Sequence, residues 1–452
     1  MSRSTTLIIA LCMLIFALPA NPAGAITYAY IPSYDGDTVV RVRTSDATYI
    51  SLDISTALPS GDTCNPYGVA VMPDGTAVLV TCDTDNTVLR ITNSDFTAGT
   101  YSRSPLAVGE TPRGVAIAPT GDYAYVANYD DDTVSKINLT TFQVVGTPTD
   151  VGEGPWGVAA IYDEPADVIR VYVANSIEGS VTVINDAVGG SITIDEITGV
   201  GGGPTGIAAS PDGRYVYVAN RNAANVAIIQ TSDNTVIDRI GISGNPWGLA
   251  VGSLGDYLYV SNNFNNVVTV IDTGTLTIHD SYLVDAPQFG VAAPRNGDFA
   301  YVINEDAGDT IRMIDLVADA VEDVIDGQTS GAVSLGDFIG GAPPVAPSGL
   351  SGSAPSYDKI DLTWIDNSSE ELGFKLERRV AGEDAYTQIA RLAADTASYT
   401  DSRVAGETSY DYRIRSYNEA ADSNYTETST EITTPEGSFS WCFVGTLLHD
   451  TF

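Results

Sequence analysis

Histidine and lysine are almost absent from this chain of 452 residues. Its two histidines are His279 and His449, and its three lysines are Lys136, Lys359 and Lys375. One histidine falls in a predicted strand and the other near the end of the chain, so no imidazole cluster forms to bind zinc, copper or haem. We therefore expect no metal site and no cofactor.

Positive charge of any kind is scarce. The chain has 21 Lys and Arg against 58 Asp and Glu, which gives a formal net charge of −37. Binding to nucleic acid or to anionic lipid depends on basic side chains that neutralise phosphate groups, so the composition excludes both partners. The acidity fits solubility, a saline habitat, a surface for polyvalent cations or a cationic partner.

A hydrophobic run long enough to cross a membrane is also missing. The chain opens with Arg3, an apolar stretch from Leu7 to Leu18 and the small residues Ala23, Gly24 and Ala25. This order is typical of a secretory signal peptide that is cleaved after Ala25, and the stretch is too short for a transmembrane anchor. We expect a secreted, cell-surface or periplasmic protein without a transmembrane span.

Two motifs recur in step along the first three quarters of the chain. The first has the pattern Pro, variable residue, Gly, aliphatic, Ala, and the second resembles YVAN and ends in a polar turn. The glycines of the first motif are Gly68, Gly114, Gly157, Gly206, Gly248, Gly290 and Gly331, at intervals of 46, 43, 49, 42, 42 and 41 residues. A period in the forties is the length of a four-stranded propeller blade.

The two motifs resemble the YVTN family of β-propeller repeats over residues 26–341. The resemblance implies seven blades. The chain enters the repeat at the second motif, so the segment from Ile26 to about Ile54 should supply the outer three strands of a blade whose innermost strand is Gly331–Gly340. Such closure removes the free sheet edges. Some propellers that resemble this one are lactonases or lyases that depend on His and Glu in the channel, and no such His is present here.

A linker at residues 342–346 breaks the period, and short alternating strands follow it. Residues 347–435 resemble a fibronectin type III-like domain, with Trp364 in the sandwich core and Tyr410 in the position of that family's tyrosine corner. Residues 436–452 form a separate C-terminal tail that includes Cys442. The predicted fold class is all-β, a seven-bladed β-propeller followed by a β-sandwich.

Cys64 and Cys82 flank a predicted hairpin whose turn is Asp74 and Gly75. Pairing outward from this turn brings the two cysteines near each other, which permits a disulfide in an oxidising compartment. Two separately buried thiols are the alternative, because a slip of one residue in the register turns a side chain to the other face.

Repeated polar residues have a structural and a functional interpretation. Asn128, Asn175, Asn220, Asn262 and Asn304 occupy one position of the repeat, and we expect them to satisfy backbone groups at strand ends rather than to bind a ligand. The acidic loops at 83–86 and 129–132 lack the Asp spacing and the downstream Glu of a calcium-binding EF-hand, so we expect solvated turns.

The residues directly before the repeated glycines form the candidate binding site. By symmetry, they should surround one mouth of the central channel, and we call them the mouth ring: Tyr67, Arg113, Trp156, Thr205, Trp247, Phe289 and Ser330. Four of the seven are aromatic, and aromatic clusters with an arginine are used for protein and sugar contacts. The alternative is that the rings only pack between blades.

These features favour an exported, non-enzymatic binding or scaffolding protein with a monomeric propeller that recognises a protein or glycan at the cell surface. Two other functions stay open. One is a carboxylate-dependent hydrolase or lyase in the channel, and the other is a structural component of a surface layer.

Overall fold

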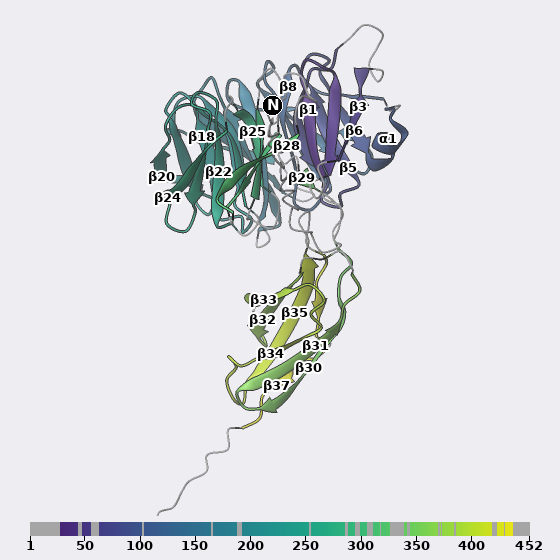
Figure 1. Ribbon diagram of the computed structural model, residues 1–452. Helices are drawn as coiled ribbons and strands as arrows, with labels where there is room; N and C mark the ends of the chain where they lie inside the picture. Colours follow the sequence, from purple (N-terminus) through teal and green to yellow (C-terminus); the bar gives the residue numbers. More distant parts are fainter. Residues whose placement is uncertain are drawn as a thin grey trace, which may run out of the picture.

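The computed structural model describes residues 28–43, 48–55, 63–101, 104–163, 166–187, 192–252, 255–284, 288–293, 299–304, 311–316, 318–325, 339–340, 344–368, 371, 373–383, 386–417, 423–428 and 430–436. The predicted signal peptide at residues 1–25, Ser330, most of the predicted strand Gly331–Gly340 and the tail beyond Glu436 lie outside these residues. Figure 1 shows a ring of upright sheets and a separate two-sheet sandwich.

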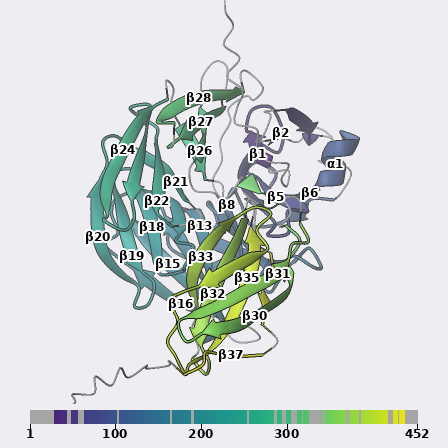
Figure 2. The ribbon, with the colours of Figure 1, turned by 60° about the horizontal axis from the view of Figure 1, so that its bottom comes forward.

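The ring consists of seven antiparallel sheets, each of which is one blade of a β-propeller, as the repeat predicts. Figure 2 shows the blades following one another around the ring in sequence order. The strands of the first three complete blades are β4 (Pro66–Val71), β5 (Ala77–Cys82), β6 (Thr87–Thr92) and β7 (Leu106–Ala107); β8 (Pro112–Ile117), β9 (Tyr123–Asn128), β10 (Thr133–Asn138), β11 (Gln143–Val144) and β12 (Thr149–Asp150); and β13 (Pro155–Asp163), β14 (Val168–Asn175), β15 (Ser180–Ala187) and β16 (Ile192–Ile197).

Three more blades follow in the same pattern, with the innermost strand first and the outermost strand last. Their strands are β17 (Pro204–Ala209), β18 (Tyr215–Asn220), β19 (Asn225–Gln230) and β20 (Thr235–Gly241); β21 (Pro246–Val251), β22 (Tyr257–Asn262), β23 (Val267–Asp272) and β24 (Thr277–Leu283); and β25 (Gln288–Ala292), β26 (Phe299–Asn304), β27 (Ile311–Asp315) and β28 (Ala320–Ile325).

Strands from both ends of the propeller sequence build the seventh blade. Its sheet order is β29 (Ile339–Gly340), β1 (Tyr28–Ser33), β2 (Thr38–Arg43) and β3 (Tyr49–Asp53). Strand β29 pairs with the beginning of β1, with Gly340 opposite Tyr28. The chain therefore closes the ring as predicted, although the described innermost strand is shorter than the segment Gly331–Gly340.

The two longest repeat intervals have separate structural causes. The 46-residue interval contains the short helix α1 (Asn93–Ala98), which the sequence did not predict and which packs Phe96 between Tyr30 and Arg41. In the 49-residue interval, strands β13, β14 and β15 have nine, eight and eight residues, whereas their counterparts in most other blades have six. The extra residues thus form helix α1 after β6 in one blade, and they lengthen the strands β13, β14 and β15 in the other.

Tyrosines in the second strand of three blades each bond to the next blade in the ring. Tyr30 donates to Asn93 over 3.3 Å, Tyr125 to Asp186 over 2.5 Å, and Tyr172 to Asn234 over 2.9 Å. The partner is 61 to 63 residues further along the chain in every pair. These rings are fully buried, so their hydroxyl groups need such partners.

The repeated asparagines also bond between neighbouring segments. Asn128 accepts from the backbone N–H of Gly109 over 3.2 Å and donates to Ser135, and Asn220 donates to the carbonyl of Val200 over 2.9 Å. Asn128, Asn175, Asn220 and Asn262 are completely buried. Their contacts agree with the strand-end interpretation, while the side chain of Asn304 lies outside the described residues.

The structure joins Cys64 and Cys82 in a disulfide, with their Cα atoms 4.5 Å apart. Cys64 lies two residues before β4, and Cys82 is the last residue of β5, opposite Pro66. The bond therefore links the segment that enters the innermost strand to the end of its neighbour. Cys442 lies outside the described residues.

The innermost strands of adjacent blades approach so closely that their glycines leave no space for a side chain. A Cβ atom at Gly157 would lie 2.3 Å from the carbonyl oxygen of Thr205 in the next blade. The same clash with the next mouth-ring carbonyl arises at Gly68, Gly114, Gly206 and Gly248, at 2.1 to 2.8 Å. The repeated glycine is thus required by backbone packing around the channel.

The sandwich has one sheet of three strands and one of five. The first contains β30 (Ser348–Ser356), β31 (Lys359–Ile365) and β34 (Ser398–Asp401); the second contains β32 (Gly373–Val380), β33 (Thr387–Ala393), β35 (Ser409–Tyr417), β36 (Thr426–Glu427) and β37 (Ile432–Thr433). Trp364 packs against Phe374 in the core, and the Tyr410 hydroxyl accepts a bond from the N–H of Ala405 over 2.9 Å.

Within the described part of the chain, we find no helix with the length and apolar character needed to cross a membrane.

Replacing Gly157 with alanine tests the packing of the innermost strands. Because the new Cβ would overlap the Thr205 carbonyl, we expect Gly157→Ala to lower the free energy of unfolding of the propeller by about 2 kcal/mol or more. Gly241→Ala is the matched control, since nothing lies within 4 Å of its Cβ position. Denaturant unfolding of both variants checks this, and equal stabilities would contradict the packing argument.

Candidate functional site

A bulge at the start of six of the innermost strands positions the described part of the mouth ring. In β4, Pro66 pairs with Cys82 and Val69 with Val80, so Tyr67 and Gly68 together oppose a single residue, Thr81. The same irregularity occurs at the start of β8, β13, β17 and β21, and in β25 the single residue Phe289 is left without an opposing residue. A bulge changes the direction of a side chain relative to strand alternation. The alternation pattern in the sequence therefore did not predict where these residues point.

Side chains on the second strand satisfy the backbone groups that two of these bulges leave unpaired. The Thr81 hydroxyl accepts from the N–H of Gly68 over 2.7 Å and donates to the Arg113 carbonyl over 2.8 Å. Ser261 accepts from the N–H of Gly248 over 2.9 Å. The bulged conformation is held by specific hydrogen bonds between and within blades.

Four aromatic members of the mouth ring meet across the channel. Ring centroids are 6.1 Å apart for Tyr67 and Trp156, 5.5 Å for Trp156 and Trp247, and 5.1 Å for Trp247 and Phe289. All three pairs have edge-to-face geometry, which is favourable for aromatic rings. Tyr67 and Trp156 are separated by the blade of Arg113, and Trp156 and Trp247 by the blade of Thr205. Contacts between such non-adjacent blades show that the rings fill this mouth of the channel.

Arg113 is the cationic centre of the cluster. Its guanidinium lies 3.9 Å from the ring centroid of Trp156, 3.9 Å from that of Tyr129 and 5.5 Å from that of Tyr67. Its Nε atom is 4.0 Å from Oδ2 of Asp83. Stacking on several ring faces holds the cation against the mouth while part of it stays accessible.

Two members of the predicted ring do not join the cluster. Thr205 is buried, and its hydroxyl donates over 3.1 Å to the carbonyl of Trp247 on the innermost strand of the next blade, so this residue links two innermost strands and does not join the aromatic cluster. Its small size also leaves room for the two tryptophans to meet. Ser330 lies outside the described residues.

A second set of residues surrounds the cluster, and sequence reasoning missed it. These residues directly follow the second strand of the six blades in which that position is described, and we call them the outer ring: Tyr34, Asp83, Tyr129, Ser176, Arg221 and Asn263. Tyr34 packs on Tyr67 at 6.1 Å, Tyr129 on Trp156 at 5.3 Å, and the Arg221 guanidinium lies 5.0 Å from the Trp247 ring. The sequence did contain a signal for this set: the residue that follows each repeated Asn varies from blade to blade, which is typical of a binding surface.

Burial changes the protonation chemistry of this mouth. It raises the pKa of the Tyr67 hydroxyl well above its ordinary value. It also raises the pKa of the Asp83 carboxyl, an effect that Arg113 opposes and the charge of Asp130 reinforces. Burial likewise raises the pKa of Tyr34. At neutral pH both tyrosines therefore act as neutral hydrogen-bonding groups.

Acidic turns beside the mouth hold the loops that enter the blades. Asp132 accepts from the N–H of Gly154 over 2.8 Å, Asp131 from the N–H of Glu110 over 2.8 Å, and Asp37 from the N–H of Cys64 over 2.9 Å. In each case the N–H belongs to a loop that leads into an innermost strand. The sequence predicted solvated turn residues, whereas these carboxylates also accept backbone hydrogen bonds that hold the loops in place.

The described mouth contains no histidine. His279 lies on β24, an outermost strand, where it is exposed and packs 4.9 Å from the Tyr257 ring. Asp83 is the carboxylate that faces the cluster, and its neighbour there is the cation Arg113. The described side chains at the mouth thus offer an aromatic and guanidinium surface with one partly buried acid.

Comparison with known proteins supports the propeller. The profile of the family described as "Lactonase, 7-bladed beta-propeller" matches residues 62–241. A seven-bladed β-propeller protein of Mycobacterium tuberculosis is 31% identical over 132 residues, which cover 28% of this chain and 31% of that protein. The chain thus spans about a third of the length of this relative in the match.

A solved structure of a functionally unknown protein from Desulfotomaculum acetoxidans has the same propeller fold. It aligns with a TM-score of 0.56 at 15% identity and covers 69% of this chain and 99% of its own. At this identity the likeness concerns the fold alone.

Replacing Arg113 with methionine tests whether the cation organises the mouth. The substitution keeps most of the side-chain volume but removes the stacked charge and the partner of Asp83, so we expect the propeller to lose about 1–2 kcal/mol of stability. Arg214→Met is the control, because the Arg214 side chain is 78% exposed and its loss should change stability by less than about 0.5 kcal/mol. Chemical unfolding compares them. Equal effects would show that Arg113 is an ordinary surface residue.

Proposed function

We propose that this chain is an exported binding or scaffolding protein without catalytic activity, and that the mouth of its propeller recognises a protein or a glycan. The observation that carries the proposal is the aromatic cluster that fills the channel mouth around Arg113. Among the described residues the rings pack against one another over the channel, and partly exposed aromatic and arginine side chains of this kind suit protein and sugar contacts.

The rim of the same face extends this surface. Ile177 and Phe264, each two residues after a repeated Asn, are 61% and 76% exposed. On the blades that carry Asp35, Asp130 and Asp131, the rim is acidic and exposed instead. A partner that combines apolar groups with positive charge would complement both sides of the mouth.

The exit of the chain leaves this face free. The mouth lies at the end of β1 and β5, where Ser33 and Cys82 are found, while Gly340 of β29 pairs with Tyr28 at the opposite end of β1. The propeller therefore passes into the linker on the face opposite the mouth. We propose that residues 347–435 are a fibronectin type III-like domain that serves as a spacer and directs the mouth outward.

Export is part of the proposal. The Cys64–Cys82 disulfide favours an oxidising compartment outside the cytoplasm, in agreement with the predicted signal peptide. We place the mature protein at the cell surface, in the periplasm or in the medium, with a monomeric propeller.

A hydrolase of the lactonase type is the second candidate. The family match over residues 62–241 and the position of Asp83 beside Arg113 favour it. A carboxyl whose pKa is raised by burial suits general acid or base catalysis. The absence of a histidine from the described mouth and the filling of the channel weigh against it.

Capture experiments test the binding function. We expect Trp156→Ala and Tyr129→Ala, which remove rings from the accessible part of the cluster, to weaken capture of the ligand from a glycan panel or a secretome at least tenfold. Tyr49→Ala, which removes a 44% exposed tyrosine from the outermost strand β3, is the control. Near-ultraviolet circular dichroism verifies that each variant is folded.

Two results would overturn the proposal. One is undiminished capture by the folded Trp156→Ala and Tyr129→Ala variants. The other is turnover of a lactone by the purified chain that Asp83→Asn abolishes, which would establish the hydrolase in its place.

A further inference from the structure

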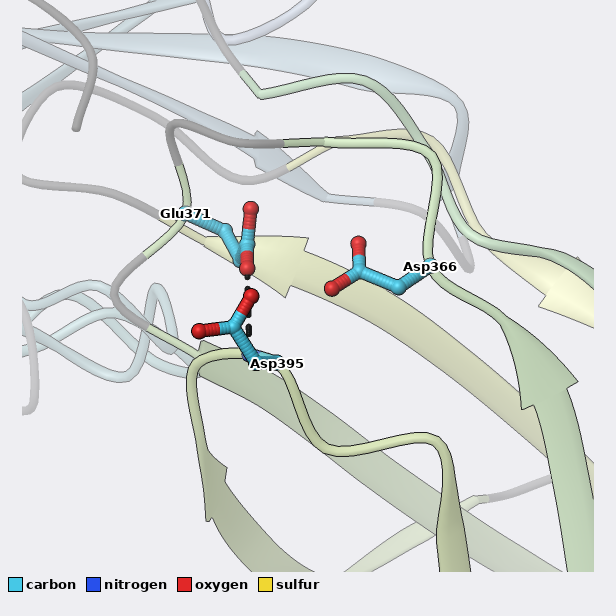
Figure 3. A group of neighbouring side chains, drawn as sticks. All are labelled: Asp366, Glu371 and Asp395. Atoms are coloured by element: carbon cyan, nitrogen blue, oxygen red, sulfur yellow. Dashed lines mark hydrogen bonds between the residues drawn. The ribbon is translucent and has the colours of Figure 1, made fainter. Parts of the chain in front are cut away.

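Three carboxylates from separate loops converge at one end of the sandwich (Figure 3). Asp366 directly follows β31, Glu371 lies two residues before β32, and Asp395 lies two residues after β33. One oxygen of each carboxylate lies within 4.8 Å of the others. Because β31 belongs to one sheet and β32 and β33 to the other, the cluster joins both sheets.

Glu371 is the unusual member of this cluster. Its side chain is only 4% exposed, yet its Oε2 atom has no hydrogen-bond partner. Its Oε1 atom accepts one long bond of 3.3 Å from the backbone N–H of Asp395. Burial of a carboxylate with so little compensation is strongly unfavourable.

Nothing among the described side chains neutralises the cluster. The ion pairs of the sandwich use Asp401, Asp411 and Glu377, and none involves the three clustered acids. Three carboxylates this close together repel one another, and a cation among them would offset that repulsion.

We propose that Asp366, Glu371 and Asp395 bind one Ca²⁺ ion. Calcium takes six to eight oxygen ligands at about 2.3–2.6 Å, so oxygens on opposite sides of the ion lie about 4.8 Å apart. The three carboxylates fall within this span. Asp395 is exposed, so water has access to complete the coordination.

The position of the site links the ion to the segment between the two domains. Strand β30 begins at Ser348, directly after the linker, and Ser348 pairs with Ile365 next to Asp366. The neighbouring Asn367 donates to the Ala346 carbonyl over 2.9 Å. Calcium would therefore fix the two sheets to each other and hold the end of the linker, which makes the spacer stiffer when the ion is bound.

Calorimetric titration of the full chain with CaCl₂ tests the proposal. The solution should contain about 0.15 M KCl, which screens diffuse attraction to the acidic surface. We expect one saturable site with a dissociation constant of about 10⁻⁴–10⁻³ M, as in extracellular calcium modules. Glu371→Gln should weaken this site at least tenfold, and Asp395→Asn, at an exposed position, should weaken it without endangering the fold.

Glu383→Gln is the matched control. Glu383 is an exposed acid just beyond the other end of β32, and the substitution removes the same charge. Without calcium, Glu371→Gln should melt at or above the temperature of the wild type, because it relieves repulsion. With calcium, the wild type and Glu383→Gln should gain stability and Glu371→Gln should not. Equal calcium binding by all variants, or no saturable site below about 10 mM, would overturn the proposal.

Discussion

The contact between an innermost-strand glycine and a carbonyl of the next blade determines the rest of the propeller. At Gly157 the available space is so small that a Cβ atom would lie 2.3 Å from the Thr205 oxygen. Strands that pack this closely enclose a narrow channel. The bulge lies beside the glycine, and the aromatic side chains of Tyr67, Trp156, Trp247 and Phe289, which precede four of these glycines, meet over the channel. The close packing of the innermost strands thus accounts for both the fold of the propeller and the position of the candidate site.

Much of this architecture could be predicted because the repeat encodes it directly. The glycine motif indicated the blade period, and the entry of the chain at the second motif indicated closure through β1 and β29. The helix α1 escaped prediction because its six residues have no helical periodicity of their own and are stabilised by tertiary contacts of Phe96 with Tyr30 and Arg41. The local sequence pattern was therefore sufficient to predict the repeated strands, but it was not sufficient to predict a helix inserted between them.

The candidate site was predicted only in part. The residues before the glycines were identified, but their directions depend on bulges that period-two alternation cannot reveal, and Thr205 bonds a carbonyl of the next blade and does not join the aromatic cluster. The outer ring and the carboxylates at Asp366, Glu371 and Asp395 arise where separate loops converge in space. Such convergence leaves no spacing signal along the chain, and it explains why acidic residues that look alike in sequence differ in their roles.

The central claim is that side chains from non-adjacent blades meet across the channel mouth and close it. A double-mutant cycle on Trp156 and Trp247, whose ring centroids are 5.5 Å apart, measures this contact directly. With Trp156→Leu, Trp247→Leu and the double variant, the account predicts a coupling of about 0.5–1.5 kcal/mol in the free energy of unfolding. Effects that add to within about 0.3 kcal/mol would contradict it, because they would mean that the two rings do not touch in solution.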